Sequence, residues 1–460
     1  MPIRLFDTVS QSLRDFEPRA PGQVGIYVCG PTVQSSPHIG HLRSALVYDL
    51  WRRWFSYRGF TVTLVRNVTD IDDKILAVGG AEEWWALAAR IEREFDSAAS
   101  ALGILPPTAE PRATGHIGDM IALIARLIDR GHAYAAEDGS GDVYFSVASW
   151  PDYGQLTRQS PDEVESDEAN SERGKKDPRD FALWKGRKDS EPATASWESP
   201  WGAGRPGWHI ECSAMATRYL GSGFDIQGGG LDLRFPHHEN ELAQSRAAGD
   251  EFATTWLHNG LVTMNGQKMS KSVGNVMSAD DLLSQTDSAT ARYFLLAPHY
   301  RSTMDVHEGS IAEAAAAWDR IRGFARRTAD VVTAAPEVPE VFAAAMDDDL
   351  AVPAALAVLH DTVRAGNTAL DASDDAAVLA RANEVAAMLT VLGLTVVATD
   401  STEATHAALG TLIDRLITER NRARADKDWA TADRIRDDID AAGITLEDGA
   451  DTTRWSINNG

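Results

Sequence analysis

Two short segments, far apart in the chain, carry residues that suit phosphate chemistry. The first is Pro37-His38-Ile39-Gly40-His41, which lies between a predicted strand and a predicted helix. A helix start offers unpaired N–H groups and a positive dipole end to phosphate, and Gly40 permits close approach of a nucleotide. The imidazoles of His38 and His41 can donate hydrogen bonds to phosphate oxygens as charge builds. The alternative interpretation is a pair of surface histidines at a helix start.

The second segment is Lys268-Met269-Ser270-Lys271-Ser272, a short polar loop with two ammonium groups. Such a loop can close over a triphosphate and stabilise the charge of the transfer step. A solvated basic surface loop is the alternative, since that is the usual fate of a lysine-rich pentapeptide. Together, the two segments would approach a triphosphate from two sides.

Four further residues form a candidate metal set. Cys29 ends the first predicted strand, and Cys212 lies on a predicted helix. His237 and Glu241 are four residues apart, so both side chains would lie on one helix face. Two thiolates, an imidazole and a carboxylate suit zinc. Buried free cysteines and a surface His–Glu pair are the alternative, because the spacing alone is weak.

The elements that must position these residues indicate an α/β fold. Residues 24–30 and 61–68 have the composition of buried strands, and the residues between them predict a helix from His41 to Gly59. This strand–helix–strand order predicts a parallel sheet of the doubly wound type. Residues after about 309 are rich in alanine and have helical periodicity, which predicts a helix bundle.

Composition limits the class of protein. A chain of 460 residues is too long for one core. Two cysteines exclude a disulfide scaffold, and neither a signal peptide nor a membrane-length apolar run is found, so we expect a cytoplasmic protein. The net charge of −24 argues against binding of a nucleic acid, whose phosphates are also negative, unless the protein has a local basic patch.

The two phosphate segments resemble the signature motifs of class I aminoacyl-tRNA synthetases, HIGH and KMSKS, letter for letter and in the same order. The resemblance narrows to cysteinyl-tRNA synthetases in four other segments, 27–32, 66–74, 207–215 and 235–241. It extends from about residue 3 to about residue 455 and is densest before residue 310.

This resemblance implies a class I Rossmann-type catalytic domain with an inserted connective segment, followed by a C-terminal helix bundle and a small terminal domain. The expected boundaries are 1–113 and 201–259 for the two halves of the catalytic domain, 114–200 for the insertion, 260–309 for the segment carrying the lysine loop, 310–400 for a tRNA-binding helical bundle, and 401–460 for an anticodon-reading unit.

The implied activity is the ATP-dependent attachment of L-cysteine to tRNA(Cys) through a cysteinyl-adenylate, with Mg²⁺ accompanying ATP. One zinc ion, on Cys29, Cys212, His237 and Glu241, would select the substrate thiol over the alcohol of serine, which an apolar pocket rejects only about 100-fold. By resemblance, the catalytic residues would be His38, His41, Lys268 and Lys271. The same four residues and Gly40 would bind ATP. The cysteine substrate would be bound by Gly30, Thr69, Trp208 and Asp232.

The C-terminal unit concentrates arginine and lysine residues with Trp429 among them, which suits unpaired bases, although interleaved acids also fit a solvated helix. The resemblance assigns anticodon contacts to Arg424, Asp433 and Asp448. One departure stands out, because the family usually has histidine where this chain has Gln227.

Two other functions stay open from the sequence. Ligases that join cysteine to an amino sugar resemble the same family and would need no anticodon reader. A non-catalytic RNA-binding relative is a third reading, which the intact phosphate segments disfavour. We expect a monomer.

Overall fold

The computed structural model describes residues 2–78, 82–158, 173–269, 274–333, 336–396, 402–448 and 453–457. Lys271 lies outside these residues. The chain forms two compact units, Met1–Thr395 and Val396–Gly460.

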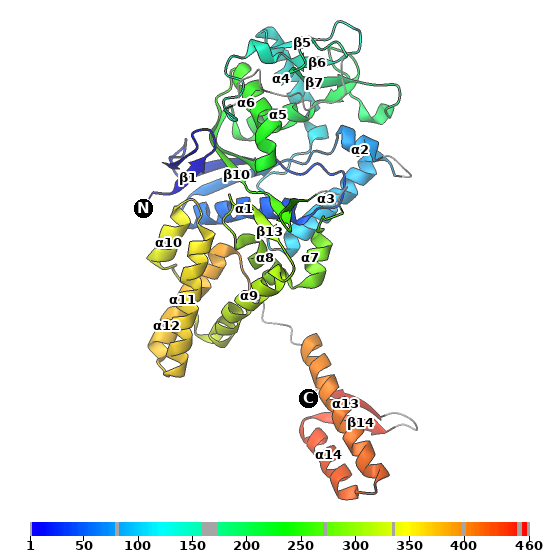
Figure 1. Cartoon of the computed structure of the whole chain (residues 1–460), viewed down its shortest axis with the longest axis vertical. Coiled ribbons are helices and arrows are strands. Elements are labelled where there is room, and N and C mark those ends of the chain that lie inside the picture. The colour runs from blue at the N-terminus through cyan, green and yellow to red at the C-terminus, as the bar shows by residue number, and fades with distance from the viewer. Residues whose placement is uncertain are drawn as a thin grey trace. The chain divides into compact units, whose positions relative to one another are not determined.

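A four-stranded parallel sheet lies at the centre of the first unit (Figure 1), which confirms the predicted doubly wound fold. The strand order is β10-β9-β3-β4. The chain leaves β3 toward one edge and β9 toward the other, so the topological switch point lies between them, where open α/β sheets bind ligands. The strands are β3 (Gln23–Val28), β4 (Thr61–Arg66), β9 (Gly223–Gly230) and β10 (Phe252–Asn259).

Helices cover both faces of this sheet (Figure 1). Helix α1 (Ile39–Tyr57) connects β3 to β4 and lies on one face, while α5 (Trp208–Leu220) and α6 (Glu239–Ala247) lie on the other. Helix α1 is buried on several sides, because helices from later in the same unit also pack against it. Its Trp51 and Trp54 side chains are fully buried. The ends of these strands and helices, with the loops that connect them, hold most of the predicted active site.

An antiparallel sheet of order β5-β6-β7-β8 is inserted between β4 and α5. Strand β8 pairs with β7, so this sheet extends past residue 200. The elements between β4 and α5 are α2 (Asp73–Ala77), α3 (Trp84–Ala101), α4 (Ile117–Asp129), β5 (Ala133–Ala135), β6 (Val143–Phe145), β7 (Phe181–Gly186) and β8 (Gly204–Pro206). A hairpin of β1 (Arg4–Asp7) and β2 (Ser12–Asp15) precedes β3.

A small sheet of order β12-β11-β13 follows β10 and carries Lys268 at the end of β12. Its strands are β11 (Val262–Met264), β12 (Gln267–Lys268) and β13 (Met304–Val306). The remainder of the first unit is helical, with α7 (Ala279–Gln285), α8 (Ser288–Leu296), α9 (Ser310–Arg327), α10 (Glu340–Asp347), α11 (Val352–Asp371) and α12 (Asp375–Leu392). Helices α9 to α12 lie in the part of the chain that was predicted to be helical.

The second unit has two helices and a β-hairpin among its described residues: α13 (Thr402–Ala425), α14 (Trp429–Ala441), β14 (Ile444–Asp448) and β15 (Thr453–Ile457). Its core is a cluster of isoleucines, of which Ile439 is the most deeply buried. In the part of the chain that the structure describes, no helix combines the length and the apolar character needed to traverse a lipid bilayer.

Candidate active site

A cleft of about 340 Å³ opens at the carboxyl ends of β3 and β9, at the topological switch point. Eight of the residues predicted from the sequence line it: Cys29, Gly30, His38, Gly40, His41, Trp208, Asp232 and Lys268. They come from strand ends, helix starts and one hairpin that are widely separated in the chain. The fold therefore gathers the phosphate segments and the amino-acid pocket around one cavity.

The first phosphate segment is ordered by hydrogen bonds within itself. The Nδ1 atom of His38 accepts from the backbone N–H of Gly40 at 3.1 Å, and Nδ1 of His41 accepts from the backbone N–H of His38 at 3.2 Å. The two rings stack with their centroids 3.7 Å apart. Because Nδ1 accepts in both neutral rings, Nε2 carries the proton in each, and such an N–H can donate to an anionic oxygen.

Backbone hydrogen bonds connect the first phosphate segment to the residues that follow the second phosphate segment. The backbone N–H of Ile39 donates to Met277 at 3.1 Å, and the N–H of Ala279 donates to Pro37 at 3.0 Å. Lys268 also lines the cleft from β12. Both phosphate segments thus adjoin the same cavity, although Lys271 lies outside the described residues.

The predicted cysteine pocket divides into residues on the cleft surface and one beneath it. Gly30, Trp208 and Asp232 line the cleft, whereas Thr69 is buried and donates to Oε2 of Glu211 at 2.8 Å. A Cβ atom on Gly30 would lie 1.6 Å from the carbonyl oxygen of Asn67, so only glycine fits there. The structure therefore places Thr69 behind the pocket, as a hydrogen-bond partner of a buried carboxyl group.

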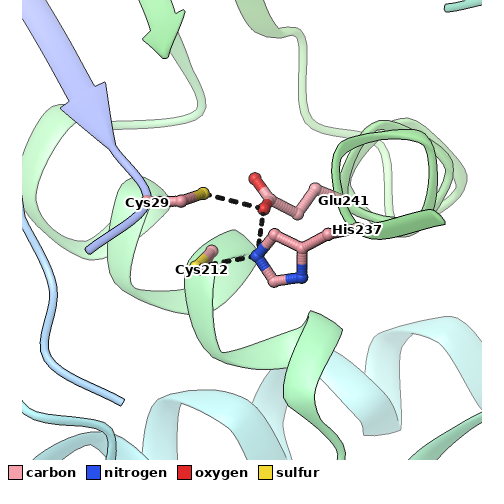
Figure 2. A group of neighbouring side chains, drawn as sticks. All are labelled: Cys29, Cys212, His237 and Glu241. Carbon is pink, nitrogen blue, oxygen red and sulfur yellow. Dashed lines mark hydrogen bonds and ion pairs between the residues drawn. The ribbon is translucent and has the colours of Figure 1, made fainter. Parts of the chain in front are cut away.

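The four predicted metal ligands converge below the cleft, and each is buried (Figure 2). One ligand atom from each residue lies within 4.8 Å of all the others. Cys29 Sγ is 3.1 Å from Glu241 Oε1, His237 Nε2 is 2.8 Å from the same oxygen, and His237 Nε2 is 3.4 Å from Cys212 Sγ. A zinc ion with bonds of about 2.0–2.3 Å requires donor atoms at roughly this separation. The geometry and the donor types fit a four-ligand metal site.

Burial and mutual contact shift the pKa values of two side chains in this cluster. Burial raises the pKa of the Cys29 thiol well above its ordinary value, and contact with Cys212 raises it further. Burial alone would lower the pKa of His237, but the Glu241 carboxylate and the Cys212 thiol raise it to about 10. Cys29 also lines the cleft, so a metal ion held here would be adjacent to a bound substrate.

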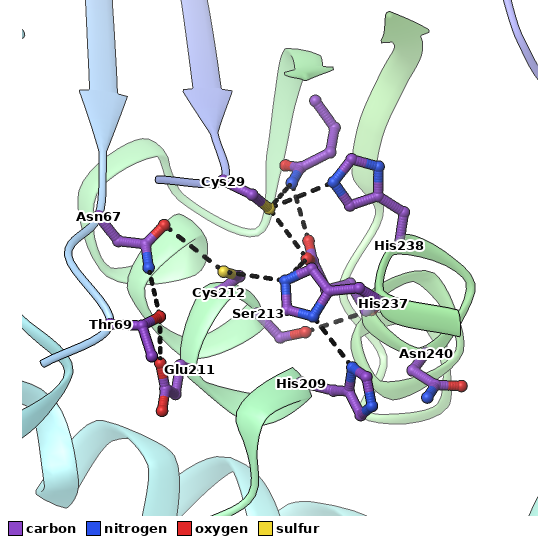
Figure 3. Close-up of polar contacts among 12 residues, drawn as sticks. Cys29, Asn67, Thr69, His209, Glu211, Cys212, Ser213, His237, His238 and Asn240 are labelled. Carbon is purple, nitrogen blue, oxygen red and sulfur yellow. Dashed lines mark hydrogen bonds and ion pairs between the residues drawn. The ribbon is translucent and has the colours of Figure 1, made fainter. Parts of the chain in front are cut away.

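Several outer contacts orient these ligands (Figure 3). Nδ1 of His209 lies 3.0 Å from Nδ1 of His237, and Nε2 of His238 lies 3.2 Å from Cys29 Sγ. Burial lowers the pKa values of His209 and His238 well below the usual range, so both rings are neutral. The Trp208 ring stacks on the His237 ring, with the two centroids 4.1 Å apart.

Sequence reasoning did not assign these outer contacts. His209 and His238 are neighbours of predicted residues in two of the segments on which the resemblance rests. The only signal was a histidine directly after a predicted residue, Trp208 in one segment and His237 in the other, and a sequence does not show which way that ring points. Lys74, whose Nζ lies 5.9 Å from the Trp208 ring centroid, lines the cleft and was likewise not assigned.

The predicted anticodon residues belong to the second unit. Arg424 is exposed near the end of α13, and Asp433 is exposed on α14. Asp448 ends β14, and its side chain lies outside the described residues. These positions are on three different elements of the unit.

Comparison with known families covers most of the chain. Residues 15–316 match the catalytic domain of class I (C) tRNA synthetases, and residues 341–396 match the DALR domain. Residues 406–455 match the cysteinyl-tRNA ligase anticodon binding domain.

Relatives of known function match from end to end. The chain is 59% identical to the cysteine–tRNA ligase of Clavibacter sepedonicus, with 100% of both chains covered. It is 60% identical to the cysteine–tRNA ligase of Leifsonia xyli, with 99% of this chain and 100% of the relative covered.

Solved structures with low sequence identity share the fold. The Mycobacterium tuberculosis methionyl-tRNA synthetase in complex with methionyl-adenylate is 16% identical, with a TM-score of 0.58 over 80% of this chain and 89% of that one. An Agrobacterium radiobacter LeuRS in a ternary complex is 11% identical, with a TM-score of 0.58 over 82% and 84%. Both support the class I fold predicted from the sequence.

Proposed function

This chain belongs to the cysteine–tRNA ligase family of class I synthetases, and from that premise we propose how its residues carry out the ligation. The enzyme attaches cysteine to tRNA. In the first step, the cysteine carboxylate attacks the α-phosphate of ATP, which yields cysteinyl-adenylate and pyrophosphate. In the second, the 2′-hydroxyl of the terminal ribose of tRNA(Cys) attacks the acyl carbon, the bond to the phosphate breaks, and AMP is released.

We assign one zinc ion per chain to Cys29, Cys212, His237 and Glu241. The observation that carries this assignment is the convergence of four buried donor atoms within 4.8 Å, with one of their residues lining the cleft. When bound, the ion supplies a preference for thiolate over alcohol, and so a means to choose cysteine over serine. Such a choice at the pocket removes the need for an editing site.

The other cleft residues bind and orient the two substrates. Asp232 is placed to accept from the ammonium group of cysteine, with Trp208 and Gly30 shaping the pocket beside it. The Nε2–H groups of His38 and His41 donate to phosphate oxygens, and Gly40 leaves room for the nucleotide. Lys268 and Lys271 neutralise charge that develops on the phosphates, with Mg²⁺ accompanying ATP.

The partners follow from the same assignment. The second unit binds the anticodon of tRNA(Cys) through Arg424, Asp433 and Asp448, while the acceptor end reaches the cleft. The anticodon-binding family match at 406–455 disfavours the cysteine–amino-sugar ligase, which has no anticodon to read. We further propose that the enzyme works as a cytoplasmic monomer.

The direct test is aminoacylation of a tRNA(Cys) transcript with radioactive cysteine, and with serine as the control amino acid. We expect charging with cysteine alone. Charging with serine at a comparable rate would contradict selection by zinc. Intact cysteine-dependent exchange of pyrophosphate into ATP without any tRNA charging would instead favour the amino-sugar ligase.

Zinc uptake should release protons and weaken as the pH falls. The metal-free His237 has a pKa of about 10, and that of Cys29 is raised well above its ordinary value, so both are protonated at neutral pH. Each must lose its proton to become a ligand, and the apparent zinc affinity therefore rises with pH until these groups are deprotonated. Calorimetric titration of the metal-free enzyme with zinc, in buffers of different ionisation enthalpy, measures the protons released. Binding without net proton release would contradict the assignment of these ligands.

A further inference from the structure

We infer that Gln227 is a positioning residue for the metal site, whose single amide nitrogen holds both Cys29 and Glu241 in place. The inference rests on the proposed zinc site. It also accounts for the chain's departure from the histidine that is usual in the family.

Gln227 lies on β9, an inner strand of the central sheet. Its side chain is fully buried, and its strand β9 runs between β3 and β10. The backbone of Gln227 is in register with Tyr27 on one side and Trp256 on the other. A residue whose backbone is fixed by two neighbouring strands presents its side chain toward a defined face of the sheet, and here that side chain reaches two of the candidate metal ligands.

The amide nitrogen contacts two of the four ligands. Nε2 of Gln227 donates to Oε2 of Glu241 at 2.8 Å and to Sγ of Cys29 at 3.3 Å. A primary amide carries two hydrogens on one nitrogen, so both contacts can be made together. A ring nitrogen of histidine carries at most one hydrogen and cannot bridge two acceptors in this way. Glutamine thus joins two ligands that come from different elements, the end of β3 and α6.

The two oxygens of the Glu241 carboxylate have different partners. Oε2 is held by Gln227, whereas Oε1 faces Cys29 Sγ and His237 Nε2 at 3.1 and 2.8 Å. Glu241 is thereby oriented to offer one oxygen to the metal. Hydrogen bonds from a neutral donor to a carboxylate and a thiolate are charge-assisted, and outer partners of this kind usually change metal affinity about 10–100-fold when removed.

The decisive variant is Gln227→Met, which keeps the length of the side chain and removes both N–H donors. We expect zinc affinity, measured by competition with a chelator of known affinity, to fall about 10–100-fold. The KM for cysteine should rise while the KM for ATP stays unchanged. Cobalt substituted for zinc should show an altered visible absorption spectrum, because the orientation of Glu241 changes.

Two further variants separate this role from a general loss of packing. Gln227→Asn keeps the amide but draws the nitrogen back by one methylene, so it should lose zinc affinity as Gln227→Met does. Gln227→His restores one N–H donor and should recover part of the affinity. The matched control is Ile226→Val, a buried change at the next position of β9, which should leave zinc affinity within about twofold.

Zinc affinity and a KM for cysteine within twofold of the wild type, in folded Gln227→Met or Gln227→Asn, would overturn the inference. Absence of stoichiometric zinc from the wild-type enzyme is a different result. It would overturn the proposed metal site, and the role of Gln227 along with it.

Discussion

Replacing Cys212 with serine is expected to remove stoichiometric zinc and to weaken cysteine binding in the same variant. Cys212 Sγ is buried and lies 3.4 Å from His237 Nε2, within the group of four donor atoms. A serine hydroxyl is a poorer zinc ligand than a thiolate. The loss of zinc affinity should exceed the range of about 10–100-fold that is usual for outer-shell partners. Elemental analysis gives the zinc content, and pyrophosphate exchange gives the KM for cysteine.

The same variant should lose discrimination, because in the proposed mechanism selection of the thiol depends on the metal. The ratio of kcat/KM for cysteine to that for serine should therefore fall along with the zinc content. Met215→Leu is the control, since Met215 is fully buried on the same helix α5 and is not a metal ligand. Unchanged zinc content in folded Cys212→Ser would remove Cys212 from the ligand set.

The fold and the composition of the site could be predicted because they depend on features that a sequence displays directly. Periodicity gave the strand–helix–strand order around α1, and the observed parallel sheet confirms the doubly wound class. The metal set was predictable from residue chemistry combined with resemblance. The chain alone could not show that Cys29 and Cys212 are close, since that proximity depends on β3 packing against α5.

Side-chain direction accounts for what the sequence left unassigned. Thr69 was expected to line the cysteine pocket, and it lies beneath it because its hydroxyl donates to the buried Glu211. Gln227 appeared only as a departure from a family pattern. Its contacts arise from the register of β9 with two neighbours, which is a property of the assembled sheet. His237 was placed on a regular helix, whereas α6 begins at Glu239 and His237 lies in the kinked segment Arg234–His238 before it, in which the backbone of Phe235 is not helical.

The second large effect is expected from Lys268→Met, which should slow adenylate formation about 100- to 1,000-fold, the usual consequence of removing one donor that stabilises transition-state charge. Lys268 lines the cleft together with His38 and His41. Backbone hydrogen bonds connect the first phosphate segment to the residues that follow the second one. The buried Arg43, on the same helix as His41, donates to the carbonyl oxygens of Gly260 and Leu261, immediately before the β11–β12 hairpin. These contacts fix the backbone that leads into the hairpin carrying Lys268.

This charge acts on the transition state, so kcat and kcat/KM for ATP should fall together, and the KM for cysteine should change little. Single-turnover formation of cysteinyl-adenylate in a rapid-quench experiment measures the chemical step directly. Lys188→Met is the matched control, because it removes an exposed lysine that does not line the cleft. A rate in Lys268→Met equal to that of the control would show that the β12 lysine takes no part in adenylation, and the charge stabilisation would then have to come from Lys271 and the histidine pair at the start of α1.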